Sequence, residues 1–229
     1  MKLFAVSEWA SRLIIVVLLS IASLAATSVS MVAQAAMDQP GRHELNRFAN
    51  DLQTMHAQFE QRVLRNDGGV ENESSGEVWL QSPHFFRWAY GGEFPEQVIA
   101  DGQRIWIYDE VLEQVTVKSQ AEFNNNSPLI ILTDIQRLDE LFEVREAGDM
   151  DGMVLLELRS NDTEAEFDRM LVGLSDGQLK MLAMEDAFGM RTEIRFTGLQ
   201  KNSQLPAGLF EFVPPDGVDV IGADDLIRP

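Results

Sequence analysis

The chain has 229 residues, a formal net charge of −19 at pH 7 and no cysteine. A charge of this sign and size disfavours binding to nucleic acid and adsorption to anionic membranes, so we expect no nucleic-acid partner. Without cysteine the protein forms no disulfide and lacks the residue that is acylated in lipoproteins. The length without its N-terminal segment suits a single domain with a sizeable core.

The first 35 residues are typical of a secretory signal peptide. Lys2 and Arg12 give a positively charged N-terminal region, and residues 13–26 are almost entirely apolar. Ala33 and Ala35 supply the small residues of a cleavage site. The alternative is an uncleaved membrane anchor, but the apolar run is shorter than the ~20 residues that a spanning helix needs. We therefore expect residues 1–35 to be cleaved and 36–229 to form one domain in the periplasm.

Residues 43–61 carry apolar side chains at steps of three and four. This spacing predicts one amphipathic helix. The apolar stripe consists of Leu45, Phe48, Leu52, Met55 and Phe59. Its ordinary role is to cover a core, and closing one side of a cavity is the functional alternative.

A polar, turn-rich stretch at 65–76 is predicted to be a loop, and after it the apolar period changes to two. Asp101-Gly102, between two apolar segments, is a strong signal for a tight hairpin. Frequent turns without intervening helices indicate one large antiparallel sheet, which must curl or close at this width. We expect strands near 76–81, 84–90, 96–101, 103–108, 111–117, 140–147, 152–159, 166–173, 178–186, 190–197 and 209–213.

The segment 105–108, Ile-Trp-Ile-Tyr, is apolar at every position, so both faces of that strand must be covered. Apart from Trp9, every tryptophan lies between positions 79 and 106, which suggests a need for large rigid apolar surface. Pro128 suits the first turn of a helix, and the unbroken apolar run after it predicts a short buried helix that acts as a plug or lid. A second short helix is predicted near 135–142.

No catalytic pattern stands out in the sequence. His43, His56 and His84 match no metal-ligand spacing, and the common nucleophile, phosphate-loop and dinucleotide motifs are missing. We therefore expect no metal, no cofactor and no enzymatic activity.

Several segments, taken in order, resemble the family of periplasmic lipoprotein carriers LolA. They are MHAQFEQ (55–61, placed in the first helix), GEVWLQSPHFFRWAY (76–90), VIADGQRIWIYDEVLEQV (98–115), NNSPLIIL (125–132) and FEFVPPDGVDVI (210–221). The resemblance implies an incomplete antiparallel β-barrel of about eleven strands, with a hydrophobic cavity covered by a lid of short α-helices. It also implies a carrier that takes acylated lipoproteins from an inner-membrane ABC transporter and delivers them to the outer-membrane acceptor LolB.

The large apolar side chains of the helix and strands are then expected to line the lipid-binding cavity: Leu45, Phe48, Leu52, Met55, Trp79, Phe86, Trp88, Trp106, Tyr108, Met170, Met181 and Met184. The lid is expected to consist of Pro128, Leu129, Ile130 and Leu132. For each residue alone, ordinary core packing is an equal alternative.

The sequence departs from the family where Ser82-Pro83 replaces an arginine-proline pair whose arginine helps to hold the lid. Arg87 is five residues further on, and an odd spacing places it on the other face of a strand. We expect a monomer. The alternatives are a related half-barrel module that binds lipid or senses lipoproteins, and a hydrolase with an apolar pocket.

Overall fold

The structure is a computed structural model and describes residues 39–121, 137–161, 167, 169–186 and 188–222. Residues Pro40–Pro229 form one compact unit, to which almost all described residues belong. The expected lid residues 128–132 and the expected signal peptide lie outside the described residues. Neither helix of the described ranges has the length and apolar character of a membrane-crossing segment.

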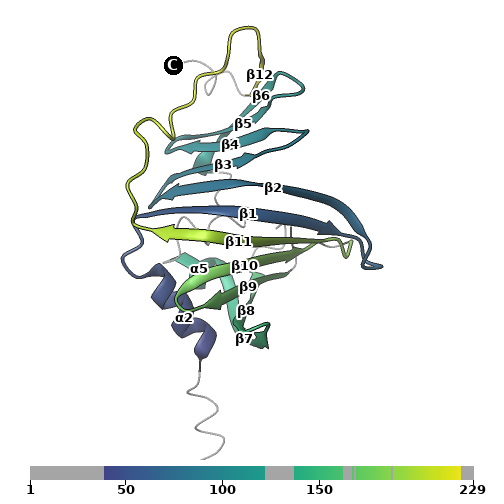
Figure 1. The fold of residues 1–229 in the computed structure, drawn as a ribbon, viewed down its shortest axis with the longest axis vertical. Helices are drawn as coiled ribbons and strands as arrows, with labels where there is room; N and C mark the ends of the chain where they lie inside the picture. The colour runs from purple at the N-terminus through teal and green to yellow at the C-terminus, as the bar shows by residue number, and fades with distance from the viewer. Residues whose placement is uncertain (1–38, 122–136, 162–166, 168, 187, 223–229) are drawn as a thin grey trace, which may run out of the picture. The chain divides into compact units, whose positions relative to one another are not determined.

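The described strands form one sheet of twelve strands in the order β12-β6-β5-β4-β3-β2-β1-β11-β10-β9-β8-β7 (Figure 1). All neighbours pair antiparallel except β12 and β6. β12 and β7 are the two ends of this order, so the described sheet is unclosed, which confirms the mainly β, incomplete-barrel fold class. The strands are β1 (Thr54–Leu64), β2 (Val70–Gln81), β3 (Phe85–Tyr90), β4 (Glu96–Asp101), β5 (Arg104–Asp109), β6 (Gln114–Ser119), β7 (Phe142–Met150), β8 (Met153–Ser160), β9 (Arg169–Ser175), β10 (Gln178–Glu185), β11 (Arg191–Lys201) and β12 (Asp219–Ile221).

The predicted helix 43–61 is wrong beyond residue 49. Helix α2 spans Pro40–Ala49, Asp51 adopts a left-handed φ of 55°, and β1 begins at Thr54. Met55 and Phe59 satisfied the helical spacing because residues four apart also share one face of a strand. The family segment 55–61 accordingly belongs to a strand and not to a helix.

The predicted loop 65–76 is wrong in most of its length, because β2 already begins at Val70. Arg62 and Glu73 pair across β1 and β2 at 2.8 Å, and Arg65 and Glu71 pair at 2.6 Å. Polar composition suggested a loop, but an exposed hairpin arm can be polar on both faces when cross-strand charges alternate in sign.

Two further predictions need correction. Residues 209–213 form no strand; the segment turns at 207–210, continues without regular structure and reaches β12 only at Asp219. The second short helix is reduced to α5 (Leu138–Leu141), because Phe142 already begins β7.

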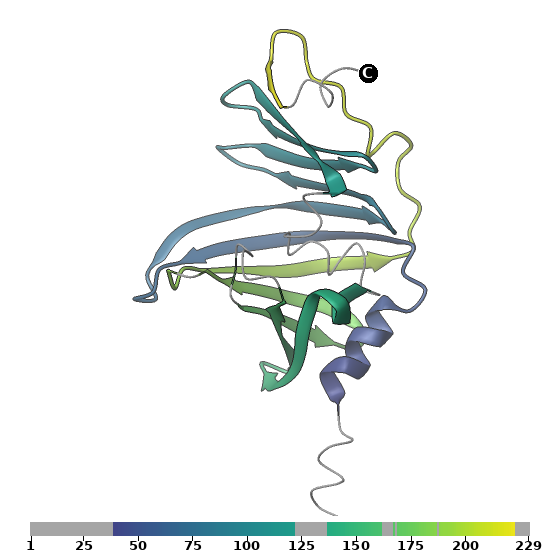
Figure 2. The same cartoon turned by 180° about the vertical axis from the view of Figure 1, so that it is seen from behind.

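Helix α2 packs across β7–β10 (Figure 2). Charged side chains of the sheet bind both of its ends. Glu146 of β7 accepts hydrogen bonds from the backbone N–H groups of Gly41 and Arg42, at 2.9 and 3.0 Å. At the other end, Lys201 Nζ donates to the carbonyl oxygen of Phe48 at 2.6 Å. Each charge complements the partial charge of the helix end that it meets. The helix is thereby fixed over one half of the sheet.

Glu44 makes a third connection between α2 and the sheet. Its carboxylate accepts a hydrogen bond from the backbone N–H of Gly177, in the β9–β10 turn. This bond holds the pKa of Glu44 below the ordinary value of a glutamate; burial opposes the shift, and the neighbouring Arg47 supports it. Because the folded pKa lies below the unfolded value, the stabilisation is present above the ordinary carboxyl range and is lost as pH falls through the folded pKa.

We therefore expect Glu44→Gln to lower the melting temperature at neutral pH but not in acid. Thermal unfolding of both proteins, followed by circular dichroism from neutral pH to below the carboxyl range, would measure this. A difference in melting temperature that stays constant over the whole range would contradict the role given to the Gly177 bond.

Gly76 lies where β2 passes unusually close to β3. A Cβ atom at this position would lie 1.9 Å from the carbonyl oxygen of Ala89 and 2.9 Å from the ring of Phe59. Backbone cannot yield as a flexible side chain does, so only glycine fits here.

We expect Gly76→Ala to lower the free energy of unfolding by about 1–3 kcal/mol, as for other overpacked sites. Gly91→Ala is the matched control, because a Cβ there meets only the Ser75 carbonyl oxygen, at 3.9 Å. Urea unfolding of the two variants would measure the difference, and equal stabilities would show that the close approach at Gly76 is unimportant.

Candidate functional site

The register of the strands separates the sheet into two faces. Residues that are directly opposite in neighbouring antiparallel strands point to the same side. One series of such partners defines the inner face: Met55, Leu80, Phe86, Ala100 and Ile105. The adjacent series defines the outer face: His56, Trp79, Arg87, Ile99, Trp106 and Val117.

The inner face is a continuous apolar surface. Along β1–β3 and β11 its centre consists of aromatic rings: Phe59 lies 4.5 Å from Trp88 and 5.2 Å from Tyr90, and Trp88 lies 6.1 Å from Phe196, between ring centroids. Towards β4 and β5 it continues with Val98 and with the group formed by Phe86, Ala100, Ile105 and Ile107. Towards β7–β10 it is aliphatic and is covered by Leu45 and Phe48 of α2.

The structure brings most of the predicted cavity residues to this inner face or packs them against it. They are Leu45, Phe48, Leu52, Met55, Phe86, Trp88, Met170 and Met184. Trp79, Trp106, Tyr108 and Met181 lie on the outer face. The twelve side chains therefore do not share one surface.

Trp106 and Tyr108 are covered by the C-terminal segment Leu209–Ile221. The Phe212 ring lies 5.6 Å from the ring of Trp106 and 5.7 Å from that of Tyr108, between centroids. Arg87 secures this segment by donating a hydrogen bond to the Leu209 carbonyl oxygen at 3.1 Å. These aromatic side chains thus belong to a second core, on the side away from the inner face.

Met181 belongs to a third, smaller group with Met153, Leu155 and Ala183, on the outer face of β8–β10. Trp79 stacks on His56, with ring centroids 5.2 Å apart and planes parallel to within 1°. Neither Met181 nor Trp79 can reach the inner face, because each side chain points from its strand to the outer side of the sheet.

The prediction missed several inner-face residues. Among them are Tyr90, Phe196, Ile194, Leu156 and Leu158. The alternation Leu156, Leu158 and Ile194, Phe196 within predicted strands carried the signal. What was missing was the strand pairing that decides which of the two faces is the inner one.

The inner face also carries a polar group at one end of β1–β3. Tyr90 donates a hydrogen bond from its hydroxyl to Gln61 Oε1 at 3.0 Å. Burial, supported by the nearby charge of Glu96, raises the pKa of Tyr90 to about 12, although hydrogen bonding with Trp88 and Gln61 acts in the other direction. Burial, together with Asp109, also raises the pKa of Glu96. Tyr90 therefore remains a neutral hydrogen-bond donor at physiological pH.

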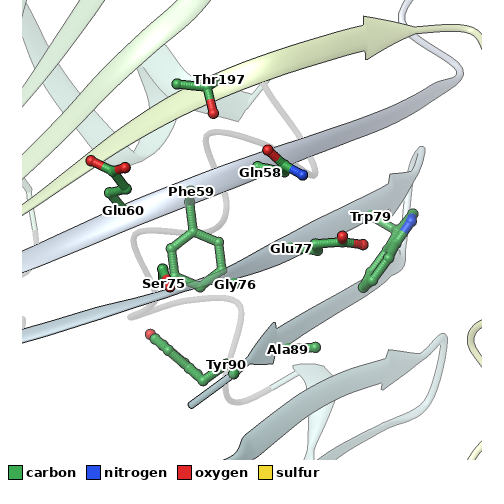
Figure 3. Close-up of a pocket in the computed structure, with 11 residues that line it drawn as sticks. Gln58, Phe59, Glu60, Ser75, Gly76, Glu77, Trp79, Ala89, Tyr90 and Thr197 are labelled. Carbon is green, nitrogen blue, oxygen red and sulfur yellow. The ribbon is translucent and has the colours of Figure 1, made fainter.

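A hollow of about 520 Å³ lies over β1–β3, and most of its side chains belong to the outer face (Figure 3). Its small residues Ser75, Gly76 and Ala89 leave the space, and Glu60 and Glu77 make it polar. Of the predicted cavity residues only Trp79 lines it, and of the inner-face side chains only Phe59 and Tyr90 reach it, so the hollow is not the predicted lipid cavity.

The inner face is chemically a hydrocarbon surface. In the part of the chain that the structure describes, no three metal-ligating side chains gather in one place. The aromatic and aliphatic side chains can enclose a hydrocarbon chain, and rigid rings lose little side-chain entropy when they do so.

Comparisons with known proteins agree with this arrangement. Residues 50–213 match the family model described as outer membrane lipoprotein carrier protein LolA. The chain is 40% identical over 183 residues to the outer-membrane lipoprotein carrier protein of Xanthomonas campestris pv. campestris (strain B100), covering 79% of this chain and 88% of that protein. It is 34% identical over 179 residues to the protein of the same name from Dechloromonas aromatica (strain RCB), covering 78% and 86%.

A solved structure gives the same fold. It is that of an uncharacterized conserved protein from Thermus thermophilus, with a TM-score of 0.52 and 13% identity, covering 80% of this chain and 99% of that chain. At this identity the likeness concerns the fold alone.

The C-terminal cover of the outer face can be tested directly. We expect Phe212→Ala to destabilise the protein by about 1 kcal/mol, because a half-buried phenyl ring is lost, and to shift tryptophan emission to longer wavelength as Trp106 meets water. Val213→Ala is the control, since Val213 is 83% exposed. Unchanged emission in Phe212→Ala would contradict this assignment of the cover.

Proposed function

The chain belongs to the LolA family of outer membrane lipoprotein carrier proteins, and we propose that it carries acylated lipoproteins across the periplasm. In this proposal it accepts them from an inner-membrane ABC transporter, shields their acyl chains on the inner face, and releases them to the outer-membrane acceptor LolB. The observation that carries the proposal is the continuous apolar inner face of the unclosed sheet.

The energetics suit such a carrier. Each buried CH₂ group contributes about 0.8 kcal/mol, so one long acyl chain gains on the order of 10 kcal/mol when fully enclosed. Most of this binding free energy must be offset by other interactions, because the carrier could otherwise not release its cargo. Residues Pro128, Leu129, Ile130 and Leu132 are proposed to compete with the acyl chains for the apolar surface, although they lie outside the described residues.

The charge of the chain supports the proposed route between two membranes. At −19 the protein is repelled by anionic lipid surfaces and attracted to basic docking surfaces on the transporter and the acceptor. Each encounter is then fast and transient. We propose that the N-terminal 35 residues direct export and are removed, that the mature protein is a monomer, and that it catalyses no covalent step, in keeping with a family of carriers.

A release experiment tests the function. The purified protein is added to spheroplasts that hold labelled lipoproteins, and the supernatant is examined for a soluble equimolar complex. A complex supports the carrier function. If the folded protein binds an apolar dye but releases no lipoprotein, a lipid-binding or sensing role on the same half-barrel takes its place.

Consecutive residues of β5 provide a matched pair of variants for this experiment. Ile107 and Tyr108 are both half-buried but point to the inner and the outer face, respectively. We expect Ile107→Asn to reduce the yield of complex at least tenfold, because an unpaired amide on the inner surface costs about 2 kcal/mol or more. Tyr108→Asn is expected to lower the melting temperature without reducing the yield to that extent. Equal yields from the two variants would contradict the inner face as the binding surface.

A further inference from the structure

Two neighbouring turns of the sheet expose large apolar side chains. β3 and β5 run in the same direction on either side of β4, so the β3–β4 turn (91–95) and the β5–β6 turn (110–113) lie at the same edge of the sheet. Phe94 in the first turn is 71% exposed, and Val111 and Leu112 in the second are 54% and 67% exposed. We call these three residues the apolar tip. Apolar side chains that gather in one exposed place with polar residues around them are typical of protein–protein contacts.

Hydrogen bonds hold both turns in place. The backbone N–H of Glu110 donates to the Pro95 carbonyl oxygen at 3.2 Å and so joins one turn to the other. Asp109 Oδ1 accepts hydrogen bonds from the backbone N–H groups of Val111 and Leu112, at 2.9 Å each. An ordered backbone therefore presents the apolar tip, which lowers the entropic cost of binding a partner.

Carboxylates surround the apolar tip, and residues 88–98 and 105–117 contain no lysine or arginine. None of these carboxylates forms an ion pair with another described residue. The β1–β2 hairpin arm differs, because arginines neutralise its glutamates across the two strands. The carboxylates beside the apolar tip are those of Glu93, Glu96, Asp109, Glu110 and Glu113.

Two of these carboxylates face each other. Glu96 and Asp109 are direct partners across β4 and β5. Like charges in this arrangement destabilise a sheet, and burial together with the charge of Asp109 raises the pKa of Glu96. A cationic group beside this pair would relieve the repulsion, so the charge of this edge suits a positively charged partner.

We propose that the apolar tip and the carboxylates around it form a docking surface for a protein segment that presents apolar side chains between lysine or arginine residues. The partner's apolar side chains cover Phe94 and Leu112, and its cations meet the carboxylates. A lipid membrane fits this edge less well, because the carboxylates repel anionic lipids. Docking here adds to the proposed function a place where a partner protein binds, and it does not require the inner face to be occupied.

The test uses two synthetic peptides of equal length and charge. One alternates leucine with lysine, and the other alternates serine with lysine. Fluorescence anisotropy of the labelled peptides is measured as purified protein is added, at low and at physiological salt. We expect the wild type to bind the leucine–lysine peptide about tenfold more tightly, and its affinity for both peptides to fall as salt rises. Equal affinities would overturn the docking surface, because charge alone would then account for binding.

Serine substitutions in the apolar tip locate the contact. Phe94→Ser and Leu112→Ser each remove one exposed apolar side chain, and we expect each to weaken binding of the leucine–lysine peptide about tenfold. Phe188→Ser is the matched control, because Phe188 is 84% exposed but lies in the β10–β11 turn, beyond β2, β1 and β11 in the sheet order. It is expected to bind as the wild type does. Wild-type affinity in both tip variants would contradict the proposal.

The carboxylates are tested by a charge-neutral double variant. We expect Glu93→Gln combined with Glu113→Gln to weaken binding of both peptides and to reduce its dependence on salt. A salt dependence equal to that of the wild type would overturn the part given to these carboxylates.

An apolar dye bound to the inner face separates docking from cargo binding. We expect the leucine–lysine peptide to leave the dye in place and the tip variants to bind the dye as the wild type does. Displacement of the dye by the peptide would place the peptide on the inner face and overturn the proposal. Binding to vesicles of phosphatidylcholine and phosphatidylglycerol that is lost in Phe94→Ser would overturn it in favour of a membrane contact. Failure to release lipoproteins from spheroplasts would count against the carrier function alone.

Discussion

The sheet is apolar along its inner face and also on the outer face over β4–β6 and β8–β10, and the remaining structure follows from the need to keep these surfaces from water. The outer face of β4–β6 is covered by the C-terminal segment, whose Phe212 packs on Trp106 and Tyr108. The inner face of β7–β10 is covered by α2 through Leu45 and Phe48. These covers belong to opposite ends of the described chain and pack on different strands of the sheet.

Helix α2 is only ten residues long and would not be stable in isolation. Its position depends on the sheet, which supplies Glu146 at the helix N-terminus and Lys201 at its C-terminus. The pKa of Lys201 is lowered mainly by burial, which indicates that its ammonium group has given up part of its hydration to bind the helix carbonyl groups. Such an anchor is costly to break, so α2 and the half of the inner face beneath it are held together by charge as well as by apolar packing.

Turn signals in the sequence located most of the strands, because glycine and aspartate at tight turns have a direct conformational cause. The apolar spacing over 43–61 led to the wrong prediction of a helix beyond residue 49, because Met55 and Phe59 fit both a helix and one face of a strand. The sequence shows that Trp88 and Trp106 are both large aromatic residues, but it does not show on which face of the sheet each of them lies. That depends on strand pairing between distant segments, which local periodicity does not contain. For this reason the sequence revealed the composition of the candidate site better than its geometry.

The unclosed sheet has two outermost strands, and the way they end has a consequence for how copies of the protein meet. At one end β12 is only three residues long, so it offers little unpaired backbone beyond β6. At the other end β7 alternates Glu143, Arg145 and Glu146 along an exposed strand. Short and charged edges are poor templates for the addition of a further strand. An unclosed sheet with such edges is thereby protected from stacking into aggregates through its backbone, a hazard that otherwise grows with every exposed hydrophobic strand.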